Sequence, residues 1–304
     1  MRQSVVVVGE SLVDIVVEPD GGTEESAGGS PLNVAVGLSR LDVPATLITQ
    51  LGRDAHGETV VAHLEDSNVE IVAVAPRNGR TSTAIARLDA EGLARYEFDI
   101  EWSLPRQELP SCWALHVGSL GASLDPGRES VLGLVEQAVA RELFISYDAN
   151  LRESFVEDHE RAWNAVRELG SRCTLVKLSD EDSELLRPGA DPDDVARSLV
   201  DGERTDMVIL TRGSKGATAF TTDLTVSALP RAVHVVDTVG AGDAFMAGTL
   251  AQLAGADAFR KGLPSDQDAL ERLVAGSIEV AALTCERRGA NPPRRQDLPA
   301  GWPG

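Results

Sequence analysis

The chain has few of the features that mark disulfide-rich, metal-binding, membrane or nucleic-acid-binding proteins. Its three cysteines, Cys112, Cys173 and Cys285, lack the spacing of a metal site, so we expect buried free thiols. No apolar run approaches the roughly 20 residues that a membrane helix needs. Lysines and arginines number 28 against 48 aspartates and glutamates, a formal net charge of −20. This shortage of positive charge argues against a nucleic acid or an anionic membrane as partner, because both bind basic surfaces.

Several common motifs are absent as well. The sequence has no Gly-Lys dipeptide, which excludes a Walker P-loop, and it has neither HExxH nor GxSxG. Gly9 stands alone after the first apolar run, and Gly240-Ala241-Gly242 continues as Asp-Ala-Phe, which breaks the dinucleotide fingerprint at its third glycine. These gaps disfavour a dinucleotide oxidoreductase and exclude the common motif-bearing hydrolases.

The composition is that of an ordinary folded protein. Hydrophobic residues make up 42% of the chain, enough for a sizeable core. We expect residues 1–304 to form a single domain. The N-terminus enters a β-branched run at once, without the layout of a cleavable signal, so a cytoplasmic location is expected.

Strand and helix patterns alternate along most of the chain. Short apolar runs indicate strands at 5–8, 46–51, 114–117, 143–147, 175–178 and 207–210. Helical spacing indicates helices at 57–68, 129–141, 162–169 and 195–200, and one more that begins with Ser30 as N-cap and Pro31 as its first residue. This alternation predicts an α/β fold, a three-layer sandwich with a mostly parallel central sheet.

Two segments break this alternation. Residues 12–17 form a second extended run, and residues 81–100 indicate a β-hairpin that turns at 89–92. The polar, glycine-containing stretch at 18–27 indicates a loop. We expect residues of about 12–27 and 80–100 to form a small separate β-sheet that acts as a lid.

A glycine-rich turn near the C-terminal end is the strongest candidate for a phosphate site. Asp237-Thr238-Val239-Gly240-Ala241-Gly242-Asp243 lies between a β-branched run at 233–236 and a helical pattern at 244–253, which predicts a strand, a turn and a helix. Glycines let backbone N–H groups approach an anion, and a helix N-terminus carries partial positive charge. A carboxylate at this helix start is therefore placed as a base beside a phosphate, which suits phosphoryl transfer to a hydroxyl.

Four segments together resemble the ribokinase-like (PfkB) family of carbohydrate kinases. They are Gly28-Gly29-Ser30-Pro31-Leu32-Asn33, Asp148-Ala149-Asn150-Leu151-Arg152, Thr211-Arg212-Gly213-Ser214-Lys215-Gly216 and the turn at 237–243, in the family's order. The resemblance extends over residues 9–293, nearly the whole chain. It implies a ribokinase-like fold and an ATP-dependent transfer of phosphate to a terminal hydroxyl of a small sugar.

The resemblance also implies a role for each matching residue. Asp243 would be the general base, and the N–H groups of Gly240, Ala241 and Gly242 would face the charge on the transferred phosphate. The residues implied at the sugar are Asp14, Gly28, Gly29, Asn33, Arg152 and the lid aromatics Tyr96 and Phe98, which would otherwise pack within the lid or in a lid–lid contact. The residues implied at the nucleotide are Lys177, Ser179, Thr211, Gly213, Lys215, Gly216, Gly240 and Gly242.

The metal assignments follow from the same resemblance, with one departure. The family often carries Asn-x-x-Glu near the magnesium ion, whereas here Ser179 replaces the asparagine and Asp182 takes the glutamate position. A shorter carboxylate still holds a magnesium-bound water, and Glu181 is the alternative. The cofactors implied are ATP and Mg²⁺, with a monovalent cation such as K⁺ near Asp237, beside the loop at 285–290.

The acceptor is left between alternatives. The short lid and the form of the N-terminal glycine motif resemble fructokinases most, which makes D-fructose the expected acceptor. In a 2-keto-3-deoxygluconate kinase, Arg87 or Arg95 would bind the acid. A nucleoside kinase needs a base slot that the sequence does not reveal, and the presence of Asp243 disfavours a catalytically silent sugar-binding protein. We expect a sugar and ATP as small-molecule partners, and a homodimer through the lid.

Overall fold

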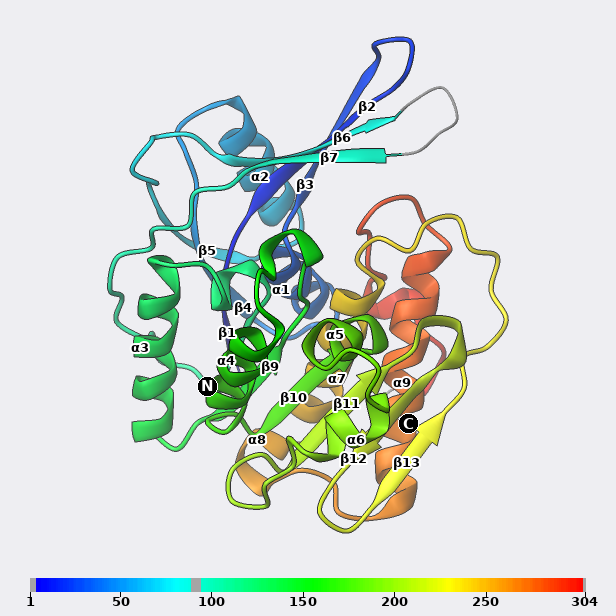
Figure 1. The fold of residues 1–304 in the computed structure, drawn as a ribbon. Coiled ribbons are helices and arrows are strands. Elements are labelled where there is room, and N and C mark those ends of the chain that lie inside the picture. The colour runs from blue at the N-terminus through cyan, green and yellow to red at the C-terminus, as the bar shows by residue number, and fades with distance from the viewer. Residues whose placement is uncertain (1–3, 89–93, 303–304) are drawn as a thin grey trace.

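A nine-stranded sheet forms the centre of the computed structural model, which describes residues 4–88 and 94–302 (Figure 1). The strand order is β13-β12-β11-β10-β9-β8-β1-β4-β5, and β12 runs opposite to the other eight. Its strands are β1 (Val5–Val8), β4 (Ala45–Gln50), β5 (Glu70–Val74), β8 (Ala114–Gly118), β9 (Phe144–Asp148), β10 (Leu175–Ser179), β11 (Met207–Thr211), β12 (Ala217–Phe220) and β13 (Thr225–Ala228).

Helices cover both faces of this sheet. On one face lie α1 (Ser30–Arg40), α7 (Ala241–Gly255), α8 (Ala258–Lys261) and α9 (Gln267–Cys285); on the other lie α3 (Gly127–Ala140), α4 (His159–Gly170), α5 (Asp180–Leu186) and α6 (Pro192–Arg197). Because side chains alternate along a strand, β1 contributes Val5 and Val7 to the hydrophobic core under α1, α7 and α9, and Val6 and Val8 to the core under α3 and α4. The predicted three-layer α/β sandwich is confirmed.

The winding of the large sheet identifies its ligand-binding edge. The chain begins at β1, adds β4 and β5 on one side, and then adds β8 to β11 on the other. In α/β sheets, ligands bind outside the carboxyl ends of the strands where the winding reverses in this way. A site is therefore expected among the residues that end or follow β1, β8, β9, β10 and β11.

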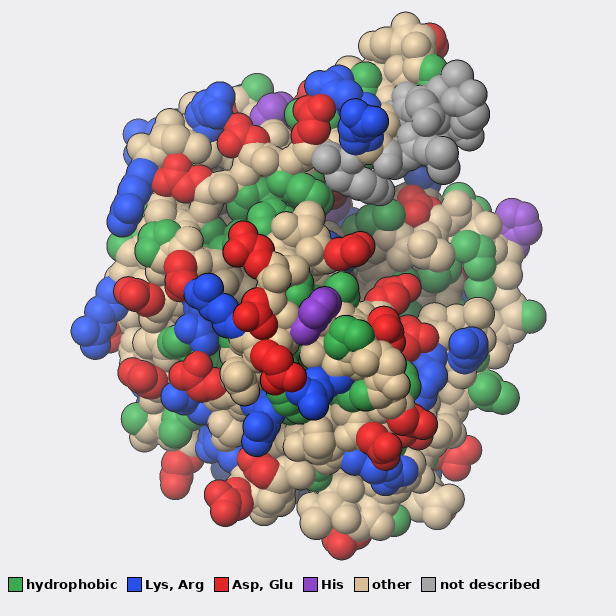
Figure 2. Space-filling model, viewed as in Figure 1, with side chains coloured by type: hydrophobic (Ala, Val, Ile, Leu, Met, Phe, Trp, Pro, Cys, Tyr) green, Lys and Arg blue, Asp and Glu red, His purple; other side chains and the backbone are tan. Residues whose placement is uncertain are grey.

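The second sheet has four strands, in the order β3-β2-β6-β7, and stands apart from the large one (Figure 1). They are β2 (Leu12–Val17), β3 (Thr23–Gly28), β6 (Ser82–Leu88) and β7 (Ala94–Asp99), and α2 (Ala55–Asp66) contacts β2 and β3. Figure 2 shows the surface hollowed between this sheet and the body of the molecule. The predicted hairpin is confirmed, and its turn lies outside the described residues.

Two local predictions in the N-terminal part are wrong. Residues 18–27 were expected as a loop, but β3 occupies Thr23–Gly28 because it pairs antiparallel with all of β2. It is an edge strand with solvent-facing polar side chains, so its composition resembles that of a loop. Helix α1 has Gly29 at the N-cap, with φ of 109°, and Ser30 is already its first residue.

The predicted strand at 233–236 is also absent. This stretch is an extended surface segment between β13 and α7, in which Val235 and Val236 are about half exposed. Its backbone N–H groups at 236 and 237 both donate to the carbonyl of Cys285 instead of to a neighbouring strand. β-Branched residues form a strand only where a partner strand is available, and none borders this segment among the described residues.

The remaining sequence predictions concern the cysteines and the membrane. Cys173 is buried as expected, whereas Cys112 and Cys285 are only partly buried, and all three are free thiols. Of the helices within residues 4–88 and 94–302, none combines the length and apolarity needed to cross a membrane.

Candidate active site

Asp243 lies at the start of α7, where α1 holds its carboxylate from both sides. Oδ1 accepts a hydrogen bond of 2.6 Å from the Ser30 hydroxyl, and Oδ2 accepts one of 2.8 Å from Asn33 Nδ2. The side chain is 6% exposed. The two donors come from the first turn of α1, and charge-assisted bonds of this length fix the orientation of the carboxylate.

The other end of the Asn33 amide has no partner. Its Oδ1 atom is buried and accepts no hydrogen bond from the described residues. Since Nδ2 is committed to Asp243, this oxygen is an acceptor that points elsewhere. An unsatisfied buried acceptor is unfavourable, so a ligand hydroxyl donating to Asn33 would be stabilised here.

The glycine turn provides N–H groups beside Asp243. Gly240 is the N-cap of α7 with φ of 74°, a left-handed conformation that favours glycine. A Cβ there would also lie 2.6 Å from the Cβ of Ala290, which is a second reason for glycine at this position. The first helical bond runs from Ala244 N to Gly240 O, which leaves the N–H groups of Gly242 and Asp243 without an intrahelical acceptor. The Ala241 N–H donates instead to Thr238 O, at 3.2 Å. The helix end therefore directs donors and partial positive charge outward, as an anion site needs.

Asp14, on β2, lies on the side of the same region that faces the small sheet. It is half-buried, and burial raises its pKa to about 6, while Arg152 lowers it and the charge on Asp243 raises it further. A Cβ at Gly28 would lie 2.0 Å from Asp14 Oδ2. The glycine predicted to admit a sugar thus also makes room for Asp14. Arg152 itself is exposed.

The small sheet, which was predicted to act as a lid, brings one aromatic residue to this side. Asp14 pairs with Ala84 and Ala84 with Phe98, so the three share one face of the small sheet. Phe98 is 37% exposed and meets Phe155 edge to face, with ring centroids 5.5 Å apart. Phe155, three residues after Arg152, was not predicted as a site residue. The side chain of Tyr96 lies outside the described part of the structure.

A buried ion pair lies behind the glycine turn. Lys177 Nζ donates to both carboxylate oxygens of Asp148, at 2.9 and 2.8 Å, and Lys177 is only 3% exposed. Burial by itself lowers the pKa of Lys177, but Asp148 and two nearby carboxylates hold it above its usual value. Burial raises the pKa of Asp148 to about 6. The ammonium lies 3.5 Å from where a Cβ at Gly242 would be, so the predicted nucleotide residue Lys177 places its charge behind the turn.

The other predicted nucleotide residues follow β10 and β11. Thr211 ends β11, and Gly213 and Gly216 both have positive φ, of 50° and 91°. A Cβ at Gly216 would lie 2.1 Å from the Ala228 carbonyl oxygen, so this turn needs glycine to lie against β13. Lys215 is exposed. Ser179 ends β10 and caps α5.

The two predicted metal residues hold backbone groups in place. Asp182 forms a capping box with Ser179, and its Oδ1 accepts the N–H of Leu151 at 2.7 Å. Asp237 accepts the N–H groups of Val239 and Gly289, at 3.0 and 2.9 Å. Among the described residues, no three His, Cys, Asp or Glu side chains gather as a protein-built metal site requires.

Two polar residues at this edge were missed by sequence reasoning. Glu10 follows β1, is 4% exposed, and accepts the Gly121 N–H at 2.7 Å; burial raises its pKa to about 7. Ser119 follows β8 with φ of 54° and ψ of −147°, a conformation that only glycine adopts readily. A glycine, Gly9, directly precedes Glu10 at the end of the first strand, and this pattern could have marked Glu10 as a site residue. Nothing in the sequence marks the strained Ser119.

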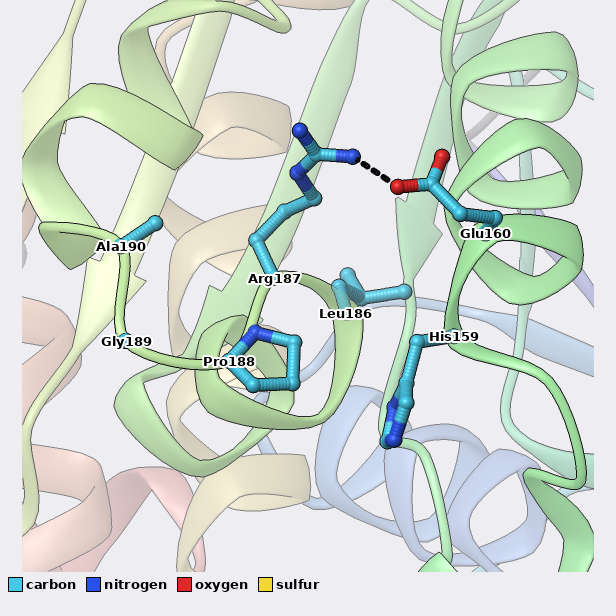
Figure 3. A pocket seen from close by; sticks show the side chains of 7 residues that line it. All are labelled: His159, Glu160, Leu186, Arg187, Pro188, Gly189 and Ala190. Atoms are coloured by element: carbon cyan, nitrogen blue, oxygen red, sulfur yellow. Dashed lines mark hydrogen bonds and ion pairs between the residues drawn. The ribbon is translucent and has the colours of Figure 1, made fainter.

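A surface hollow of about 410 Å³ lies elsewhere, between the start of α4 and the end of α5 (Figure 3). None of its lining residues was predicted in the site. Its charged groups are paired with each other, Arg187 Nη1 to Glu160 Oε1 at 2.6 Å, and His159 Nδ1 meets the Leu185 carbonyl oxygen at 2.6 Å. The hollow therefore offers a ligand no free charged group.

Comparison with known proteins identifies the family of the chain. The model of the pfkB family carbohydrate kinases matches residues 2–297. The chain belongs to this family. Among its relatives, this pfkB kinase is 30% identical over 298 residues to a fructokinase of Salmonella typhimurium, covering 95% of both chains. It is 32% identical over 263 residues to a fructokinase of Rhizobium leguminosarum bv. trifolii, covering 82% of this chain and 79% of the relative.

Solved structures agree with this assignment. The fructokinase of Vibrio cholerae O395, in its form with bound fructose, ADP and calcium ion, superposes with a TM-score of 0.80 at 25% identity, over 95% of this chain and 94% of that one. An uncharacterized sugar kinase from Pyrococcus horikoshii in complex with ATP has a TM-score of 0.80 at 26% identity, over 97% and 96%. The ribokinase-like fold predicted for this pfkB kinase is thereby confirmed.

Proposed function

We propose that this pfkB kinase transfers the γ-phosphate of ATP to a terminal hydroxyl of D-fructose. The observation that carries the proposal is the buried Asp243 carboxylate, held between Ser30 and Asn33 at the helix end that directs free N–H groups outward. The fructokinase relatives and the fructose-bound structure support the choice of acceptor.

Asp243 is the proposed general base. Its carboxylate takes the proton of the acceptor hydroxyl while that oxygen forms a bond to the γ-phosphorus, and the bond from phosphorus to the β-phosphate bridging oxygen breaks, releasing ADP. The N–H groups of Gly242 and Asp243 stabilise the charge on the transferred phosphoryl oxygens. The free Oδ1 of Asn33 accepts a second hydroxyl of the sugar, which holds the acceptor in place.

The residues present fit a magnesium ion carried mainly by the ATP phosphates. Both oxygens of Asp182 already accept hydrogen bonds, Oδ2 from the Ser179 N–H in the cap of α5 and Oδ1 from the Leu151 N–H, so it would contact the ion through water. Asp237 keeps lone pairs free after accepting two N–H groups, which fits a monovalent cation there. When bound, magnesium neutralises the phosphate charge.

A neutral acceptor agrees with the charges near Asp14. In β6, Arg87 lies three residues from Ala84, so Arg87 and its pair mate Arg95 share the face of the small sheet opposite to Asp14. Arg87 also pairs with Glu97, at 3.3 Å. Neither arginine is then placed to bind a sugar acid, and Arg152 is left as the arginine on the acceptor side.

Steady-state kinetics with ATP-Mg test the acceptor. We expect kcat/KM for D-fructose to exceed that for 2-keto-3-deoxygluconate and for nucleosides by tenfold or more, about 1.4 kcal/mol of transition-state discrimination. A tenfold advantage of the keto acid would overturn fructose and keep the kinase. A folded protein that binds ATP and phosphorylates none of these acceptors would overturn fructose and leave two readings, a kinase of another sugar or a silent binding protein.

We further propose that two lids pair in a homodimer. Val17 and Ile85 lie on the sheet face opposite to Asp14 and are only half-buried, and β3 and β7 are the edge strands of the small sheet. Light scattering after size exclusion is expected to give twice the chain mass, and Ile85→Asp to give a monomer. A wild-type monomer at micromolar concentration would disprove the pairing.

A further inference from the structure

Arg40, the last residue of α1, lies at the opposite end of that helix from the residues that hold Asp243. Its side chain is 8% exposed, which is unusual for an arginine. Nε donates to Ser67 Oγ at 3.0 Å, and Nη1 donates to Asn291 Oδ1 at 2.6 Å and to the Pro292 carbonyl at 2.9 Å. The guanidinium thus joins the ends of α1 and α2 to the segment that follows α9.

That segment leads directly to the glycine turn. Ala290 lies against Gly240 so closely that a Cβ at Gly240 would be 2.6 Å from the Ala290 Cβ. The neighbouring Gly289 N–H donates to Asp237, whose other oxygen accepts the Val239 N–H. Residues 289–292 are therefore bound to Arg40 at one end and to the turn at the other.

We infer that Arg40 is a positioning residue for nucleotide binding, which it supports by holding residues 289–292 against the glycine turn. The inference rests on the proposed use of that turn for ATP. Without the guanidinium, two acceptors on the segment lose their donor, Ala290 is free to move away from Gly240, and the anion site is less well preorganised. The acceptor side, built on Asp14, the lid and Asn33 in the first turn of α1, receives no hydrogen bond from Arg40 among the described residues and is left intact.

The test compares Arg40→Met with Arg294→Met. Asp66 Oδ2 lies 4.0 Å from Arg40 Nη2 and pairs with Arg294 at 3.0 Å. The Arg294 side chain, however, is 44% exposed and donates to no atom of residues 289–292. For Arg40→Met we expect the dissociation constant for ATP-Mg, measured by calorimetry, and the KM for ATP to rise about tenfold, the loss of roughly one charge-assisted bond. The KM for the sugar should stay within twofold, and Arg294→Met should resemble wild type.

A structural role alone would give a different result. If Arg40→Met is folded, has a lower Tm and binds ATP-Mg within twofold of wild type, the inference is wrong; equal rises in both KM values also overturn it. Should Arg40→Met fail to fold, Asn291→Ala removes one acceptor at an exposed position and must show a smaller rise in the same direction. Calorimetry reads ATP binding without any acceptor, so a failure of the fructose proposal is seen separately in the turnover assay.

Discussion

Replacing Asp243 by asparagine is expected to reduce turnover by about 10²–10⁴-fold while ATP-Mg still binds. The amide cannot take a proton from the acceptor hydroxyl. It is nearly isosteric, and Asn33 can turn its unpaired Oδ1 toward the new NH₂ group, so the variant should fold. The rate of ADP release with fructose measures the loss, and calorimetry with ATP-Mg measures the binding.

Ser30→Ala is the matched control for this variant. It removes the 2.6 Å donor to Oδ1 but leaves the carboxylate and the Asn33 bond in place. We expect a loss of about tenfold or less, the size of one hydrogen bond. A folded Asp243→Asn enzyme that turns over within a few-fold of wild type, or a Ser30→Ala enzyme that is the more impaired of the two, would show that the base is another residue.

Replacing Lys177 by methionine is expected to destabilise the fold by about 3–5 kcal/mol at pH 7, because it leaves the Asp148 carboxylate buried without its partner. The free energy of unfolding from urea titration measures the loss. Asp148 already has its pKa raised above that of an unfolded chain, and the variant raises it further. Since the folded state then favours the protonated acid, the deficit should shrink as the pH falls from 7 toward 4 and grow as it rises.

Two further variants test the cause. Lys177→Met combined with Asp148→Asn carries no unpaired charge and should recover most of the lost stability at pH 7. Lys261→Met removes an exposed lysine, 72% accessible and paired at 3.4 Å with Asp257, and should change stability by less than about 0.5 kcal/mol. A double variant no more stable than Lys177→Met alone would mean that lost packing, and not the buried charge, destabilises the protein.

Much of the fold was predictable because its signals are local. Buried parallel strands appear as short apolar runs, as in Val5 to Val8, and a helix shows in the spacing of its apolar residues. The glycine turn and Asp243 were found for the same reason, since Gly240 needs its left-handed backbone whatever surrounds it. Local signals misled where strand pairing decides: residues 233–236 have no partner strand in the described part of the chain, whereas β3 pairs with β2.

The partners of the site residues could not be predicted, because they are far away in the chain. Ser30 was expected to cap α1, yet its hydroxyl is bound to Asp243, 213 positions later. Arg40 and Asn291 are 251 positions apart, and they meet where α1 lies against both α7 and Pro292, with Gly37 facing Ala247. Composition and spacing thus specify most of the strands, helices and turns of this kinase. The environment of each carboxylate, its burial and its donors, follows from how those elements pack, since desolvation and hydrogen bonding depend on distances that no local pattern encodes.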